Sequence, residues 1–131
     1  MSKHHFHDEF EILLSLSDAG HVFIEDKIYP LKKGTLLLIK DTTLHKTIVE
    51  SSHTYERYVI HFSNSTLERI STKNTALSSF FSDLNTCLQL SNDEFIFFIS
   101  KIKKVQTCNS QEFGDDILNN TYFIQLLIEI A

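Results

Sequence analysis

The stretch His5-Phe6-His7-Asp8-Glu9-Phe10-Glu11-Ile12-Leu13-Leu14-Ser15-Leu16-Ser17 places two histidines and a glutamate at even offsets. Successive side chains of a β-strand point to opposite faces, so residues at even offsets share one face. The side chains of His5, His7 and Glu11 are therefore expected to point into one space.

A fourth candidate for this space follows a second strand-like stretch. Gly34 is a turn residue, and the apolar run over 36–39 that comes after it predicts a strand covered on both faces. A polar turn then leads to His45. Three imidazoles and one carboxylate are suited to a metal ion or to hydrogen bonds with a polar ligand, and the sequence leaves both interpretations open.

Length and charge limit the classes of function. With 131 residues the chain is long enough for one domain with a proper core. Its net charge is −5, from 12 basic and 17 acidic residues, and the basic residues form no stripe, so it is a poor nucleic-acid binder by itself. No apolar run could span a membrane, and the polar start does not resemble a signal peptide. We expect a cytoplasmic protein in which Cys87 and Cys108 are free thiols.

Short strand patterns separated by turn signals fill the chain up to Ser63. The expected strands cover residues 9–17, 21–25, 28–29, 36–40, 44–50 and 55–63. This spacing is typical of an antiparallel sandwich or barrel. In the first strand Phe10 and Ile12 alternate with Glu11, so amphipathic alternation alone would leave Glu11 in solvent. A sheet with helices on one side and a polar-lined cavity on the other accounts for both faces.

After Ser63 the apolar periodicity becomes helical. We expect a loop with a short helix over 64–75, then helices over 76–90, from a cap at Asn92-Asp93 to about Cys108, and over 116–131. The last helix is too apolar for one buried stripe, which predicts a second apolar face for a partner. Because the sequence stops within this apolar run, we expect the natural chain to continue.

These motifs resemble the two signature motifs of the cupins, and more closely the N-terminal ligand-binding domain of AraC/XylS-type transcription regulators. The stretches that carry the resemblance are residues 5–13, 29–39, 44–45 and 55–62. The resemblance implies a mainly β protein: a cupin-like antiparallel β-barrel (jelly roll) over 1–63, followed by about three α-helices in an extension over 64–131 that packs on it.

The sequence departs from the family pattern in three places. Asp18 stands where a turn glycine is usual, and Lys40-Asp41-Thr42 lacks the usual proline before His45. The two helix-turn-helix units of these regulators have no counterpart here. The resemblance therefore implies a sensing and dimerising module that touches DNA only through a missing C-terminal domain.

For the site, His5, His7, Glu11 and His45 match the cupin metal-ligand positions one for one. In metal cupins these residues hold zinc, iron, manganese or nickel. In the regulators they often line the effector pocket instead, and a vestigial role is the third interpretation. Apart from such a divalent metal no cofactor is expected, and the effector would be a small polar molecule such as a sugar.

Three further residues have the parity of this inward face. Arg57 is expected to contact a carboxylate, phosphate or hydroxyl pair of the ligand, or else to form a salt bridge with Glu11 or Glu56. Thr47 is a further pocket candidate, because it follows the histidine of the second motif by two residues. His61 is interpreted as a hydrogen-bonded core histidine.

The last helix, over 115–131, is the candidate dimer interface. Its heptad-like stripe and a bordering leucine comprise Ile117, Thr121, Ile124, Leu127 and Ile128. In the regulators that the sequence resembles, a late helix of this domain pairs with its copy, often as an antiparallel coiled coil. Plain packing against the barrel is the alternative.

The sequence thus predicts the effector-binding domain of an AraC-type regulator that is a homodimer and not an enzyme, with no membrane partner. The first alternative is a small metal-dependent cupin enzyme of the dioxygenase or isomerase type. The second is a stand-alone cupin that binds a ligand without catalysis.

Overall fold

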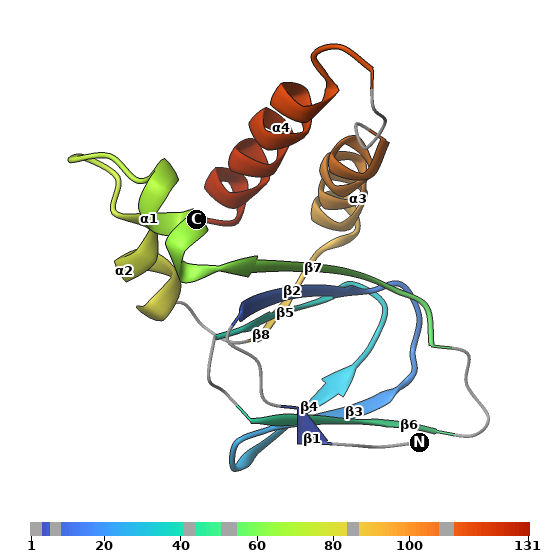
Figure 1. Ribbon diagram of the computed structural model, residues 1–131. Coiled ribbons are helices and arrows are strands. Elements are labelled where there is room, and N and C mark those ends of the chain that lie inside the picture. Colours follow the sequence, from blue (N-terminus) through green and yellow to red (C-terminus); the bar gives the residue numbers. More distant parts are fainter. Residues whose placement is uncertain (1–3, 6–8, 41–43, 51–54, 84–86, 108–111) are drawn as a thin grey trace. The chain divides into compact units, whose positions relative to one another are not determined.

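The computed structural model describes residues 4–5, 9–40, 44–50, 55–83, 87–107 and 112–131. The chain divides into two compact units, Met1–Leu90 and Ser91–Ala131. Strands and two short helices make up the first unit, and two longer helices make up the second (Figure 1). The change to helical periodicity at Ser63 lies inside the first unit, because the two short helices belong with the strands.

One antiparallel sheet has the strand order β1-β6-β3-β4. Its strands are β1 (His4–His5), β6 (His45–Val49), β3 (Gly20–Ile24) and β4 (Lys27–Leu31). The turn between β3 and β4 consists of Glu25 and Asp26. Pro30 lies in β4 at the end of this strand order, where a residue without a backbone N–H is tolerated.

A second antiparallel sheet has the strand order β7-β2-β5-β8. Its strands are β7 (Arg57–Ser63), β2 (Glu9–Ser15), β5 (Thr35–Ile39) and β8 (Cys87–Gln89). Its register pairs Glu11 of β2 with His61 on one side and with Ile39 on the other. The expected strands up to residue 63 are therefore present, with ends shifted by one or two residues.

Both sheets contribute to one buried core within the first unit. The buried members of this core are Leu13, Ala19, Val22, Ile24, Leu31, Leu37 and Ile39. Leu13, Leu37 and Ile39 come from the second sheet, and the others from the first sheet or the turn before it. The predicted fold class, a cupin-like antiparallel β-barrel (jelly roll) followed by helices, is confirmed, and the structure forms it from two antiparallel sheets packed as a sandwich.

The opposite face of β2 is also buried. Phe10 stacks on Phe62 of β7 with the ring centroids 5.5 Å apart. Phe81 of α2 (Leu77–Asp83) meets Phe62 edge to face. The short helix α1 (Asn64–Ile70) begins after Ser63, whose hydroxyl caps it by accepting a hydrogen bond from the Thr66 amide. Apolar residues therefore cover both sides of β2.

The predicted helix over 76–90 is wrong in its second half. Helix α2 ends at Asp83, and residues 87–89 form β8 instead. The backbone of β8 pairs with β5, and the amide of Leu90 donates to the carbonyl of Gly34 at 3.0 Å. These partners lie far away in the sequence, so the local apolar pattern could not reveal them.

The second unit is a pair of helices, α3 (Asn92–Thr107) and α4 (Asp115–Ile130). The cap of α3 is Ser91 and not the expected Asn92-Asp93 pair. The Ser91 hydroxyl accepts from the Glu94 amide, and the Glu94 carboxylate accepts from the Ser91 amide, which is a capping box. Among the described residues no helix is long and apolar enough to cross a membrane.

Candidate functional site

A buried carboxylate lies between two imidazoles at one end of the sandwich. Oε1 of Glu11 is 2.8 Å from Nε2 of His61 and 3.9 Å from Nε2 of His45. The side chains of Glu11 and His45 are buried, whereas 42% of the His61 side chain is exposed. The group, defined here as the polar triad, therefore has one edge open to solvent.

The strand register explains why these three side chains meet. Glu11 and His61 are direct partners on β2 and β7, and paired residues of neighbouring strands share a face of the sheet. His45 belongs to the other sheet, where it pairs with Ile24. The polar triad therefore joins the two sheets across the interior of the sandwich.

The structure describes only part of the predicted group of three histidines and one glutamate. The structure brings Glu11 and His45 together. His5 lies opposite His45 in the ladder between β1 and β6, and nothing further is described of its side chain. His7 lies outside the described residues. His61 is hydrogen-bonded, as expected, but it is not a core residue because it is exposed.

The described side chains do not form a metal site. Where the structure describes side chains, it contains no group of three or more His, Cys, Asp or Glu residues placed to hold a metal ion. A carboxylate and an imidazole are ligands that zinc and iron accept, but such ions need at least three protein ligands. Glu11 and His45 could hold one only if His5 and His7 completed the set.

Tyr55 brings a buried phenol to the interior of the sandwich. Its hydroxyl has no hydrogen-bond partner of standard geometry in the described part of the chain. Burial raises the pKa of this phenol, while the nearby Arg57 guanidinium and the Thr47 side chain act in the opposite direction. Thr47 therefore lies near this hydroxyl, as its parity predicted for an inward residue.

Arg57 makes a ring contact, and not the salt bridge that was the alternative to ligand binding. Its guanidinium carbon lies 4.3 Å from the centre of the Tyr55 ring. In the register it pairs with Ser15, and it lies at the start of β7, four residues before His61. Arg57 is exposed, and the described contacts include no salt bridge from it to Glu11 or Glu56. It therefore belongs to a different end of the strand from the polar triad.

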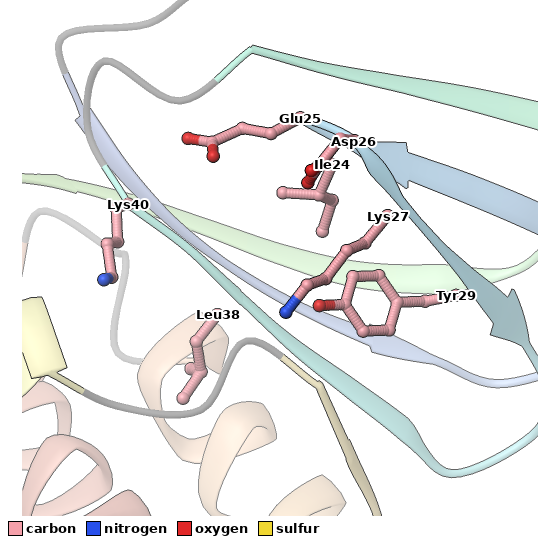
Figure 2. Close-up of a pocket in the computed structure, with 7 residues that line it drawn as sticks. All are labelled: Ile24, Glu25, Asp26, Lys27, Tyr29, Leu38 and Lys40. Carbon is pink, nitrogen blue, oxygen red and sulfur yellow. The ribbon is translucent and has the colours of Figure 1, made fainter.

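A pocket of about 130 Å³ opens beside the turn between β3 and β4 (Figure 2). This turn pocket is lined by Ile24, Glu25, Asp26, Lys27, Tyr29, Leu38 and Lys40. Ile24 is the register partner of His45, so the pocket and the polar triad lie at the same end of the sandwich. Sequence reasoning missed these residues because Glu-Asp-Lys resembles any polar hairpin turn, and Lys40 reaches the pocket only through the tertiary fold.

Helix α4 exposes most of its predicted stripe. Ile117 is 69% exposed and Ile128 is 46% exposed, and Thr121 between them is exposed as well. Ile124 is half-buried. Leu127 is fully buried within the single chain, so it has no surface left to offer a partner.

Comparison with known proteins gives one match that covers nearly the whole chain. The family model described as the AraC-like ligand binding domain matches residues 1–127. No curated protein matches. The solved structure of the plu4264 protein from Photorhabdus luminescens is similar over 63% of this chain and 62% of that chain, with 20% identity and a TM-score of 0.44. This likeness is too weak to add to the argument, so the family match is the informative finding.

Proposed function

The chain belongs to the AraC-like ligand-binding domain family, and on this premise we propose that it senses a small polar molecule for a transcription regulator. The molecule binds at the end of the sandwich that holds the polar triad. Its arrival changes how the two sheets are held together, and this change is passed to a DNA-binding domain outside the present sequence. The observation that supports the proposal most is the buried Glu11 between His45 and His61.

The chemistry of the polar triad suits a ligand with several hydrogen-bonding groups. The carboxylate of Glu11 accepts hydrogen bonds, and each imidazole can donate or accept. Burial of Glu11 and His45 strengthens such bonds because water competes less there. Sugar hydroxyls are one ligand class with these properties. Thr47 and Tyr55 extend the polar lining further along the interior.

We propose that the protein acts as a homodimer through α4. The exposed side chains of Ile117, Thr121 and Ile128 lie on one stripe of this helix at heptad-like spacing. Pairing of two such stripes would set the separation of two DNA-binding domains. The net charge of −5 fits a domain that leaves the contact with DNA to another part of the protein. A regulator of this kind works in the cytoplasm and has no membrane partner.

One observation keeps a second function in view. His5 is the register partner of His45, so β1 brings a further imidazole-bearing residue to the strand of the polar triad. If His5 and His7 complete a ligand set with Glu11 and His45, the protein would be a metal-dependent cupin enzyme. Metal analysis of protein purified without a histidine tag distinguishes the two functions. Stoichiometric metal that is lost in His7→Ala would favour the enzyme.

The proposed function is tested by ligand screening of the whole chain. Melting temperatures are measured with a library of sugars, polyols, amino acids and small organic acids. The function predicts at least one ligand that stabilises the native protein and loses affinity in Glu11→Gln, but not in His21→Gln, which replaces an exposed histidine. If no compound of any class stabilises the protein, or if binding is unaffected by Glu11→Gln, the proposed site is wrong.

A further inference from the structure

The turn pocket gathers charges of both signs that have no partner within the described structure. Glu25 and Asp26 form the turn, Lys27 starts β4, and Lys40 directly follows β5. None of these four side chains takes part in an ion pair or side-chain hydrogen bond with another described residue. Figure 2 shows Lys27 and Tyr29 projecting from β4 and Lys40 from the end of β5. Opposite charges thus line one small space without neutralising each other.

The backbone at Glu25 supports a role for its side chain. Glu25 has a φ of 55° and is the only residue other than glycine with positive φ in the described chain. This left-handed conformation is strained for an ordinary residue, and glycine, asparagine or aspartate would be the usual choice at such a turn position. Retaining a glutamate there is explained if its carboxylate has a task in the pocket.

The remaining lining gives the pocket an apolar floor. Ile24 and Leu38 are buried, and the ring of Tyr29 is half-buried. The volume of about 130 Å³ is close to that of the ~150 Å³ cavity that accommodates benzene. A ligand of this size has room for a short aliphatic group and one charged end group of each sign.

We propose that the turn pocket binds a small zwitterion, specifically a free α-amino acid with a short apolar side chain. Lys27 and Lys40 bind the carboxylate, and Glu25 and Asp26 bind the ammonium group. The side chain of the ligand lies against Ile24. This inference rests on the proposed function. It names the class of ligand that binds at the end of the sandwich where the polar triad lies.

Simpler ligands fit this set of charges less well. A monovalent anion would face the carboxylates of Glu25 and Asp26, and a monovalent cation would face the ammonium groups of Lys27 and Lys40. A neutral sugar would leave all four charges without a counter-charge. Only a ligand with both charges satisfies the two pairs together.

Binding in this pocket would connect the two sheets. The turn belongs to the sheet of β3 and β4, whereas Leu38 and Lys40 belong to β5 and the residue after it in the other sheet. A ligand held from both sides adds a bridge beside the polar triad. Because such a ligand binds only the folded state, it stabilises the protein, and the stabilisation grows with the logarithm of the ligand concentration once this exceeds Kd.

The test is an NMR titration of the ¹⁵N-labelled 131-residue chain with each of the twenty amino acids. L-Valine has matched analogues: isobutylamine keeps only its ammonium group, and 3-methylbutanoate keeps only its carboxylate. L-Arabinose serves as the neutral polyol. We expect at least one amino acid to shift the amides of residues 24–29 and 40, with L-valine binding at least about tenfold tighter than either analogue.

Variants separate binding from folding. Lys27→Gln is expected to weaken amino-acid binding at least about tenfold, whereas Lys32→Gln, which replaces an exposed lysine away from the pocket, is not. Glu25→Gly relieves the positive-φ strain, so it should raise the melting temperature and still weaken binding. A loss of affinity in this variant therefore cannot be attributed to misfolding.

Any of three results would overturn the inference. No amino acid shifts the amides of residues 24–29 and 40, or L-valine binds no more tightly than its two analogues. The third is that Lys27→Gln binds amino acids as tightly as the native protein does. If L-arabinose or another neutral compound shifts the amides of the polar triad while no amino acid binds, the proposed function stands and the zwitterion is excluded. The proposed function itself fails when no compound of the library stabilises the protein, or when binding is unaffected by Glu11→Gln.

Discussion

Oε1 of Glu11 lies 2.8 Å from Nε2 of His61, and this hydrogen bond joins a buried carboxylate to an imidazole that is 42% exposed. Replacing Glu11 by alanine removes the bond and the polar neighbour of His45. We expect the free energy of unfolding to fall by about 1–3 kcal/mol, the usual cost of losing a hydrogen bond shielded from water. Urea denaturation followed by circular dichroism measures the change.

The matched variants of this pair should differ in a defined order. Glu11→Gln keeps an acceptor oxygen near His61 and should cost less than Glu11→Ala. His61→Ala should cost less than Glu11→Ala too, because water can replace an exposed partner. A loss in Glu11→Gln equal to that in Glu11→Ala would contradict this order, because glutamine keeps both the side-chain volume and an acceptor oxygen.

The glycine that begins β3 allows a second prediction. Gly20 has a φ of +151°, and a Cβ atom at this residue would collide with the backbone carbonyl oxygen of Ile48 in β6. Gly20→Ala must therefore displace β6 or strain the backbone, which should cost about 1–3 kcal/mol. Gly114→Ala is the control: its φ is +89°, but nothing lies within 4 Å of the added Cβ. If both variants lower the melting temperature equally, the contact with β6 is not the cause.

The core between the sheets supports a third prediction. Leu37 is fully buried and packs in the cluster that contains Leu13 and Val22. Leu37→Ala should lower the free energy of unfolding by about 2–5 kcal/mol, because it removes buried apolar contacts and leaves a cavity. Ile28→Ala, at a residue that is 58% exposed, should change it by less than about 0.5 kcal/mol. Chemical denaturation of both variants tests whether Leu37 is in the core and Ile28 on the surface.

The sequence predicted the fold where structure depends on local pattern. Alternation in β2, the apolar run of β5 and the turn glycine Gly34 correspond to elements that short windows of sequence define. It failed at β8, because the pairing of residues 87–89 with β5 depends on backbone hydrogen bonds to residues far away in the sequence. Glu11 and His45 were identified as neighbours through the family motif.

The remaining site residues depend on register and on tertiary structure. His61 joins the polar triad because β7 pairs with β2 in one register, which parity alone does not determine. Arg57 has the same parity, yet it lies over Tyr55 and not beside Glu11. Lys27 and Lys40 line the same turn pocket, although Lys27 belongs to one sheet and Lys40 follows a strand of the other. These residues are far apart in the sequence, so a short stretch of it cannot reveal which of them are neighbours in the fold.

Alkaline pH should destabilise the protein through Tyr55. Burial raises the pKa of this phenol above that of an unfolded tyrosine, which is about 10. Between the two pKa values the unfolded state binds fewer protons, so the free energy of unfolding falls as the pH rises. The stabilising contribution is complete below pH ~10 and is lost as the pH passes the raised folded-state pKa.

Melting temperatures between pH 8 and pH 11 measure this effect. Tyr55→Phe cannot ionise, so it should retain more of its neutral-pH stability above pH ~10 than the native protein. Tyr58→Phe is the control, since it removes the hydroxyl of a neighbouring tyrosine and leaves Tyr55 in place. Parallel curves for the native protein and Tyr55→Phe would contradict the assigned role of Tyr55.

The proposed dimer can be tested on α4 without disturbing the fold of the helix. Ile117 is 69% exposed, so a glutamate there remains in solvent in the monomer and keeps a good helix former in place. In a dimer the same carboxylate would be buried against the partner copy, and we expect dissociation to become at least about tenfold easier. Ile96→Glu on α3, at a residue that is 67% exposed, is the matched control and should leave the dimer intact. Sedimentation equilibrium over a range of concentrations measures both variants. A native protein that stays monomeric throughout, or equal dissociation in the two variants, would show that the stripe of Ile117 and Ile128 is not the interface.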